Sequence, residues 1–196
     1  MIKIIGTSHL QSKEEIERIL KNERPDIIGI ELCEAREQAI INQIKQEPRK
    51  EDTLLNKITS SIKQKADEQG LDYGADMKTA LRFARENKID YVLVDMPILK
   101  TQELFNKIPK EEQQGFAKEL MEFQNNVNIN TKVDENEVIS QMKSRYPIAF
   151  EFLINMRNLY ISNQILIAER NNPNKTIVVI LGSAHAEQVK KMVGVR

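Results

Sequence analysis

The chain has 196 residues, 40% hydrophobic and 30% charged, which is the composition of a globular protein long enough for one substantial α/β domain. Lysine plus arginine number 29, as do aspartate plus glutamate, so the charge balance does not support general nucleic-acid binding. No apolar run approaches the ~20 residues of a membrane helix. Because the single cysteine cannot form an internal disulfide and no leader precedes the first apolar run, we expect a cytoplasmic protein.

The N-terminal stretch predicts a parallel strand–helix–strand unit. Residues 1–5 form a β-branched apolar run bounded by Gly6, which is typical of a buried strand. Ser12 and Glu15 have the spacing of a capping box, and apolar residues at helical spacing follow them. Residues 27–32 predict a second strand, which a helical crossover makes parallel to the first.

Helical periodicity dominates the rest of the chain. Helices are expected over residues 33–45, 53–69, 75–87, around 116–123 and over 147–168, and further strands at 90–94 and 176–181. The sequence therefore predicts a single α/β domain over residues 1–196. It contains a small, mainly parallel four-stranded sheet surrounded by helices, with a helical insertion over residues 99–172 before the last strand. The strand order is left open.

Polar residues follow the four predicted strands. His9, Glu31, Asp95 and His185 should meet at one edge of the sheet, because the carboxyl ends of parallel strands share an edge. The two histidines of the chain each close a Gly-x-x-His sequence, whose glycine we expect to permit a sharp turn and a close approach of backbone or ligand. Neutral imidazoles with a carboxylate suit a divalent ion such as zinc, manganese or cobalt.

Each of these residues also has a structural interpretation. A histidine at a strand end can cap the next helix or satisfy a buried backbone group. Glu31 can pair with Arg36, and Asp95 can form a turn before Pro97. Asp76 is favoured as a helix-start acid, and Cys33 as a small buried side chain.

The order of these motifs resembles that of the TraB/PrgY family. The resemblance rests on Gly6 to His9, on Pro25-Asp26 leading into Glu31 to Arg36, on Gly74 to Met77 with Val94-Asp95, Ile98 and Thr101, on Arg157-Asn158 with Tyr160-Ile161, and on Leu181 to His185. The chain departs from the family's pattern at Asp76, Met96 and Met156. The family is related to the Tiki and GumN proteins and, more distantly, to heme-binding and erythromycin-esterase-like proteins.

The resemblance implies a function and a set of site residues. Tiki members are described as metal-dependent proteases that use both Gly-x-x-His histidines, and TraB members are associated with the shutdown of a peptide pheromone. Carried over to this chain, it implies His9, Glu31 and His185 as site residues, with Arg36, Asp76, Asp95 and Arg157 lining the pocket.

We therefore expect a metal-dependent hydrolase of peptide or other amide or ester bonds. His9, His185 and Glu31 would hold a manganese, cobalt or zinc ion, Asp95 or Asp76 would orient water or act as general base, and Arg36 or Arg157 would stabilise the oxyanion. The alternative is a non-catalytic protein that binds a peptide or cofactor in the same cleft. A purely structural role for both histidines is the third hypothesis, and the sequence leaves a homo-oligomer open.

Overall fold

The computed structural model describes residues 1–7, 12–42, 54–68, 70, 72–126 and 135–195. The chain forms two compact units, and each is described by itself. The first, the sheet unit, consists of Met1–Ile44, Gly74–Ile98 and Arg157–Arg196. The second, the helical unit, consists of Lys45–Tyr73 and Leu99–Met156. Residues 99–172, predicted as one insertion, are thus divided between the two units, and the helical unit also includes residues 45–73.

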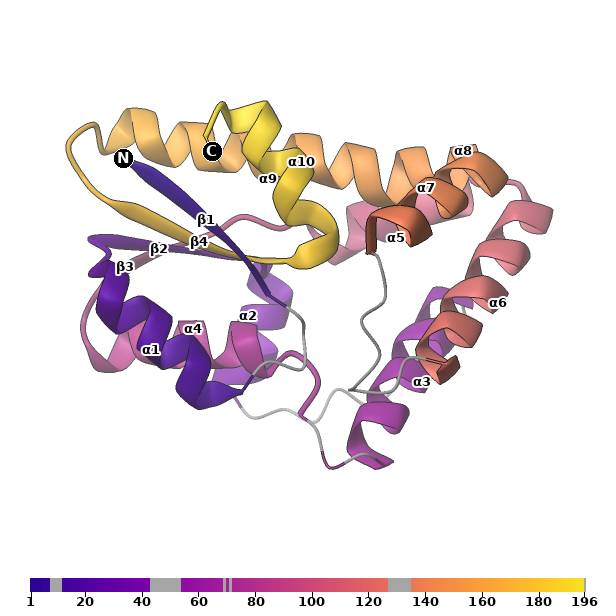
Figure 1. The fold of residues 1–196 in the computed structure, drawn as a ribbon, viewed down its shortest axis with the longest axis horizontal. Coiled ribbons are helices and arrows are strands. Elements are labelled where there is room, and N and C mark those ends of the chain that lie inside the picture. Colours follow the sequence, from indigo (N-terminus) through magenta and orange to yellow (C-terminus); the bar gives the residue numbers. More distant parts are fainter. Residues whose placement is uncertain (8–11, 43–53, 69, 71, 127–134, 196) are drawn as a thin grey trace. The chain divides into compact units, whose positions relative to one another are not determined.

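The sheet unit contains four parallel strands in the order β1-β4-β2-β3 (Figure 1). They are β1 (Ile2–Thr7), β2 (Ile27–Ile30), β3 (Asp90–Leu93) and β4 (Ile177–Gly182). This confirms the predicted α/β class and the parallel four-stranded sheet. The last strand in the chain lies between the first and the second, and every residue of β4 is buried.

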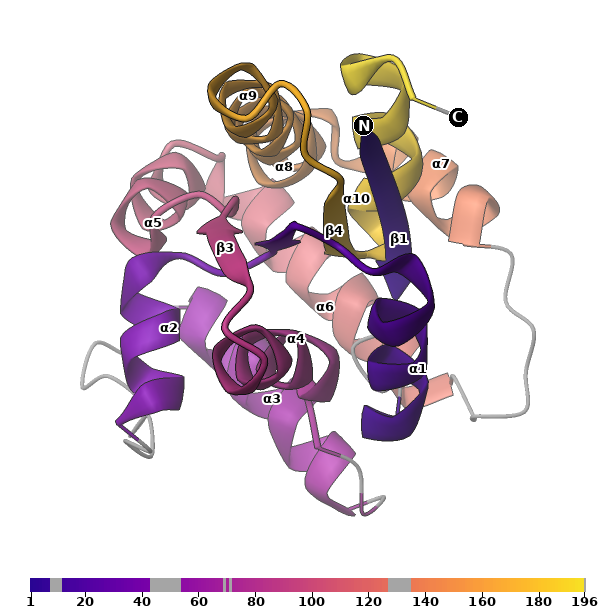
Figure 2. The ribbon, with the colours of Figure 1, turned by 90° about the vertical axis from the view of Figure 1, so that its left-hand side faces the viewer.

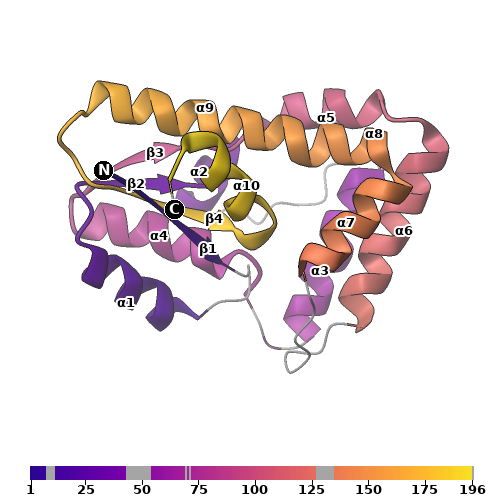
Figure 3. The same ribbon diagram turned by 45° about the horizontal axis from the view of Figure 1, so that its top comes forward.

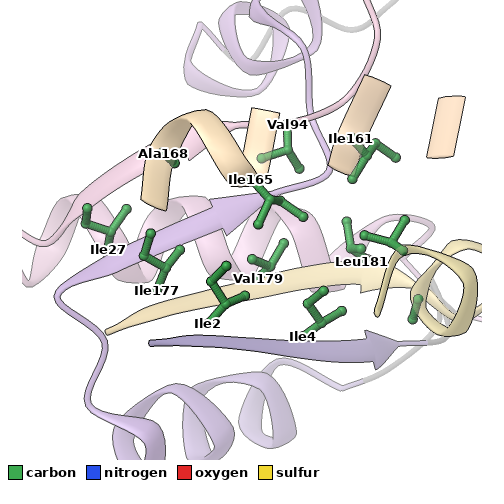
Figure 4. Close-up of a cluster of buried hydrophobic side chains, with 12 residues drawn as sticks. Ile2, Ile4, Ile27, Val94, Ile161, Ile165, Ala168, Ile177, Val179 and Leu181 are labelled. Carbon is green, nitrogen blue, oxygen red and sulfur yellow. The ribbon is translucent and has the colours of Figure 1, made fainter. Parts of the chain in front are cut away.

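Alternating side chains bury both faces of this sheet. Ile4 of β1 and Val179 of β4 pack with Ile161 and Ile165 on one face, which α9 (Met156–Asn171) and α10 (Ser183–Val193) cover (Figures 2 and 4). Ile30 and other side chains of opposite orientation pack on the second face, against α1 (Lys13–Glu23) and α4 (Ala75–Glu86). The period of two along each strand therefore supplies two apolar layers.

The first strand runs one residue beyond the predicted glycine boundary. Gly6 lies within β1, opposite Leu181, and Thr7 ends the strand opposite Gly182. A Cβ added at Gly6 would lie 3.0 Å from the Cβ of Ala186, so the absent side chain allows α10 to pack closely on β1. Gly6 therefore serves helix packing here and not the sharp turn that the sequence suggested.

Three helices of the sheet unit begin in different ways. The Ser12 side chain accepts a hydrogen bond from the Glu15 amide at the start of α1, as the capping box predicts. Gly74, with φ of 76°, lies in the left-handed region immediately before α4. The predicted 33–45 helix is α2 (Glu34–Ile41), which begins after Cys33.

The helical unit has its own hydrophobic core, which includes Phe105, Phe116 and Phe150. Its helices are α3 (Leu54–Glu68), most of α5 (Ile98–Asn106), α6 (Lys110–Asn126), α7 (Glu135–Arg145) and α8 (Pro147–Phe150), and α3 packs beside α6 (Figure 1). Phe116 meets Tyr146 edge-to-face at a centroid distance of 6.1 Å. The Glu112 carboxylate accepts hydrogen bonds from the Ile148 and Ala149 amides and so caps α8. As predicted, the described residues between 99 and 170 include no strand.

The predicted 147–168 helix consists of three segments. A π-helical turn, η1 (Glu151–Asn155), separates α8 from α9. On α9, Leu159 is 56% and Ile167 41% exposed, whereas Ile161 and Ile165 are fully buried. Helix α9 is apolar on several sides, and its buried stripe includes the polar residue Asn158 together with Ile161 and Ile165. None of the helices within the described ranges combines the length and apolar character that crossing a bilayer requires.

Candidate functional site

The topology brings the ends of the four strands to one edge of the sheet. Thr7 ends β1, Gly182 ends β4, Glu31 directly follows β2, and Asp95 follows β3 by two residues. Each of these residues is buried. His9, expected as a metal ligand, lies outside the described residues.

Glu31 links three of the elements at this edge. Its Oε2 accepts a hydrogen bond of 2.6 Å from the Gly182 amide, and its Oε1 lies 3.0 Å from Nη2 of Arg157 and 3.7 Å from Nε2 of His185. The side chain is only 4% exposed. An amide and a guanidinium thus hold a buried carboxylate beside the imidazole, which satisfies the requirement of a buried charge for partners.

Asp95 holds two arginines together. Arg157 donates to it from Nε and Nη2 over 3.0–3.1 Å, and Nη1 of Arg36 donates to Oδ2 over 2.6 Å. The Met96 amide donates to Oδ1 over 2.8 Å. Both carboxylate oxygens are therefore engaged, and the Asp95 side chain is only 1% exposed. Arg36, the alternative partner expected for Glu31, pairs with Asp95 instead.

The His185 ring is held from the α9 side. Its Nδ1 lies 2.6 Å from Oδ1 of Asn158, and Nδ2 of Asn158 donates to Oε1 of Gln188 over 2.8 Å. Asn158 is fully buried and His185 is 5% exposed. A carbonyl oxygen can only accept, so this contact is a hydrogen bond when Nδ1 of His185 carries a hydrogen.

Asp76 connects α4 to the end of β1. The Thr7 hydroxyl lies 2.6 Å from Oδ2 of Asp76 and 3.1 Å from the Leu181 carbonyl oxygen. The Met77 amide donates to Oδ1 of Asp76 over 2.8 Å at the first turn of α4. Asp76 is fully buried, so it is a helix-start acid, as its structural interpretation predicts, and also a link to the strand that leads toward His9.

The fit of a metal ion can be tested on the described donors. Two ligands each ~2.1 Å from a tetrahedral ion are roughly 3.4 Å apart, close to the 3.7 Å between Nε2 of His185 and Oε1 of Glu31. Arg157 shares this oxygen but keeps its hydrogen bonds to Asp95 if the oxygen turns to a cation. Within the described ranges, which omit His9, no three His, Cys, Asp or Glu side chains form a group that could hold a metal. The described part thus contributes two of the three expected donors, at a suitable distance.

Gln188 was not predicted as a site residue, and the supporting contacts of Thr7 and Asn158 were not predicted either. Asn158 falls on the buried stripe of α9, three residues before Ile161 and seven before Ile165. A polar side chain on an otherwise apolar stripe must find a hydrogen-bonding partner in the core, and this was the available signal. Cys33 is buried, as its structural interpretation predicts.

Comparison with known proteins gives no family assignment. The chain matches no protein-family model, no curated protein and no solved structure. The resemblance to the TraB/PrgY family therefore stays a prediction that rests on the sequence motifs alone.

Proposed function

We propose that the protein is a metal-dependent hydrolase that cleaves an amide or ester bond in a peptide or another small substrate. His185, Glu31 and His9 would hold the divalent ion. One observation carries the proposal: Nε2 of His185 faces Oε1 of Glu31 at 3.7 Å while Asn158 engages the opposite ring nitrogen. A metal-binding histidine normally donates its other N–H to an oxygen in this way.

The ion, when bound, would lower the pKa of a coordinated water molecule and polarise the carbonyl of the scissile bond. Arg157 supports the proposal because its guanidinium lies against Glu31, with a side chain 17% exposed. It is therefore the residue that we assign to stabilise negative charge developing on the substrate oxygen. Arg36, whose side chain is 40% exposed, is the second cation on Asp95 and contributes to the positive charge at the rim.

Asp95 and Asp76 receive positioning roles in this proposal. Asp95 accepts hydrogen bonds on both oxygens and fixes the two arginines. Asp76 is fully buried and is bound by Thr7 and by the Met77 amide. Neither carboxylate is therefore our choice for the general base, a role that the sequence had left open for both.

The test combines metal analysis with a hydrolysis assay. Tag-free wild-type protein should retain about one equivalent of manganese, cobalt or zinc, and His185→Ala and Glu31→Gln should lose it. Glu37→Gln is a matched control, because Glu37 is also buried but bonds to Tyr91. Equal metal content in all four proteins would refute the proposal.

The same metal-loaded protein should cleave members of a mixed peptide library in a reaction that a chelator stops. Peptide retained without cleavage would refute the hydrolase and support the non-catalytic binding protein.

A further inference from the structure

Helices α9 and α10 pack on the same face of the sheet (Figure 3), and Asn158 is a residue of α9. Its amide spans two side chains of α10, with Oδ1 at 2.6 Å from Nδ1 of His185 and Nδ2 at 2.8 Å from Oε1 of Gln188. The residue is fully buried. A buried amide bonded at both ends has a defined orientation, which is costly to reverse because each end must find a new partner.

We propose that Asn158, itself held by Gln188, is a positioning residue that fixes His185 as the Nδ1–H tautomer and presents the Nε2 lone pair to the site. The biological role of this tautomer, which is to keep His185 ready as a metal ligand, rests on the function proposed above. The tautomer itself is a property of the metal-free protein, so it can be tested separately.

The distance from His185 to Asn158 is the geometric basis of the tautomer, and Glu31 lies too far away to compete for the ring hydrogen. Asn158 lies within hydrogen-bond distance of Nδ1, whereas the 3.7 Å between Glu31 Oε1 and Nε2 is too long for a hydrogen bond. Glu31 is also held in place by the Gly182 amide and by Arg157. The hydrogen of the neutral ring is therefore placed on the Asn158 side.

Gln188 determines which end of the Asn158 amide meets the histidine. In the observed arrangement, Gln188 offers its carbonyl oxygen to Nδ2 of Asn158, which turns Oδ1 toward His185. The opposite tautomer would need the Asn158 amide to reverse, and then Gln188 to reverse as well. The three side chains thus form one relay that selects a single tautomer.

Imidazole nitrogen NMR measures the tautomer directly. Chelator-treated protein with ¹⁵N-labelled histidine shows only two imidazole rings, and the His9→Gln variant assigns the His185 signals. We expect the nitrogen shift of a protonated nitrogen at Nδ1 and that of an unprotonated nitrogen at Nε2 at neutral pH. An Nε2–H tautomer or a doubly protonated ring would overturn the proposal.

Variants on the same pair of helices supply the second test. Asn158→Leu keeps a similar volume without the oxygen, and we expect it to lose the Nδ1–H preference and to weaken cobalt affinity about 10–100-fold. Ser162→Ala is the matched control, because Ser162 is buried on α9 and bonds across to Met192 of α10 over 3.5 Å. It should leave the tautomer and the affinity unchanged.

Gln188→Met keeps the test decisive if Asn158→Leu fails to fold, since Gln188 is only half-buried. We expect a mixture of both tautomers in this variant, and an unchanged wild-type tautomer would overturn the relay. A wild-type protein with the Nδ1–H tautomer but without affinity for cobalt, manganese or zinc would refute the proposed hydrolase and leave the positioning role intact.

Discussion

Replacement of Arg157 by methionine should destabilise the sheet unit by about 3 kcal/mol. Methionine keeps the apolar stem but removes a guanidinium that donates to Asp95 and Glu31 over 3.0–3.1 Å. The two carboxylates are 1% and 4% exposed, so they lose a charged partner in a site with little water. Breaking a buried pair costs about 3–5 kcal/mol, and the lower end applies because Arg36 and two backbone amides still hold the carboxylates.

Urea unfolding followed by far-UV circular dichroism measures this effect. With a slope of about 2 kcal/mol per molar urea, the midpoint should fall by roughly 1.5 M. Lys175→Met is the control in the same unit, because Lys175 and its partner Asp90 are 42% and 75% exposed and the pair should be worth at most about 1 kcal/mol. A loss at Arg157 no larger than that at Lys175 would refute the argument that burial makes this cluster strong.

Three further predictions concern other contacts. Thr7→Val should destabilise the protein by about 2 kcal/mol in urea unfolding, because buried Asp76 loses its hydroxyl partner at 2.6 Å; equally buried Thr79→Val is the control, and equal losses would contradict the prediction. The hydrogen bond to Glu37 and burial raise the pKa of Tyr91 above its ordinary value of 10.0. The protonated Tyr91 side chain therefore contributes fully to folding stability below pH 10.0, and this contribution is lost as the pH rises through the folded-state pKa. Phenolate absorbance should place the titration of Tyr91 above pH 10.0, and Glu37→Gln should lower its midpoint; an unchanged midpoint would count against the prediction. Gly115→Ala should lower the melting temperature despite its better helix propensity, since the new Cβ would lie 2.5 Å from the Tyr146 ring, and Tyr146→Leu should relieve the clash; an unchanged melting temperature would rule the clash out.

The sequence was sufficient to predict the strands because each is a short β-branched run between breakers. The strand order was less accessible, although β4 carries the signal of a central strand. Residues 177–181 are all apolar, which is typical of a strand that is buried on both faces in the middle of a sheet. Strand β3, in contrast, begins with the exposed residue Asp90, as is common for an edge strand. The buried side of α9 could not be predicted, because the exposed residues Leu159 and Ile167 are as apolar as the buried residues Ile161 and Ile165 and periodicity does not distinguish them.

The sequence predicted those residues of the candidate site that lie at the ends of strands. Glu31, Asp95 and His185 could be brought together from topology alone, because parallel strands end at one edge. The pairing of Arg36 with Asp95 depends on three-dimensional distances that no spacing in the chain encodes. The role of Asn158 could not be predicted, because it depends on a contact between two helices with His185, which is 27 positions away in the sequence.

The central position of β4 affects the timing of folding. Among the strands of the described ranges, β1 pairs with β4 alone, with Ile2 opposite Ile177, so this edge strand cannot join the sheet until β4 has been synthesised. At a synthesis rate of about 5–20 residues per second, the roughly 170 intervening residues take about 10–35 seconds to leave the ribosome. Among the four strands of this sheet, β1 is therefore synthesised before the others but can join the sheet only after β4, and its isoleucines lack their sheet partner during that interval.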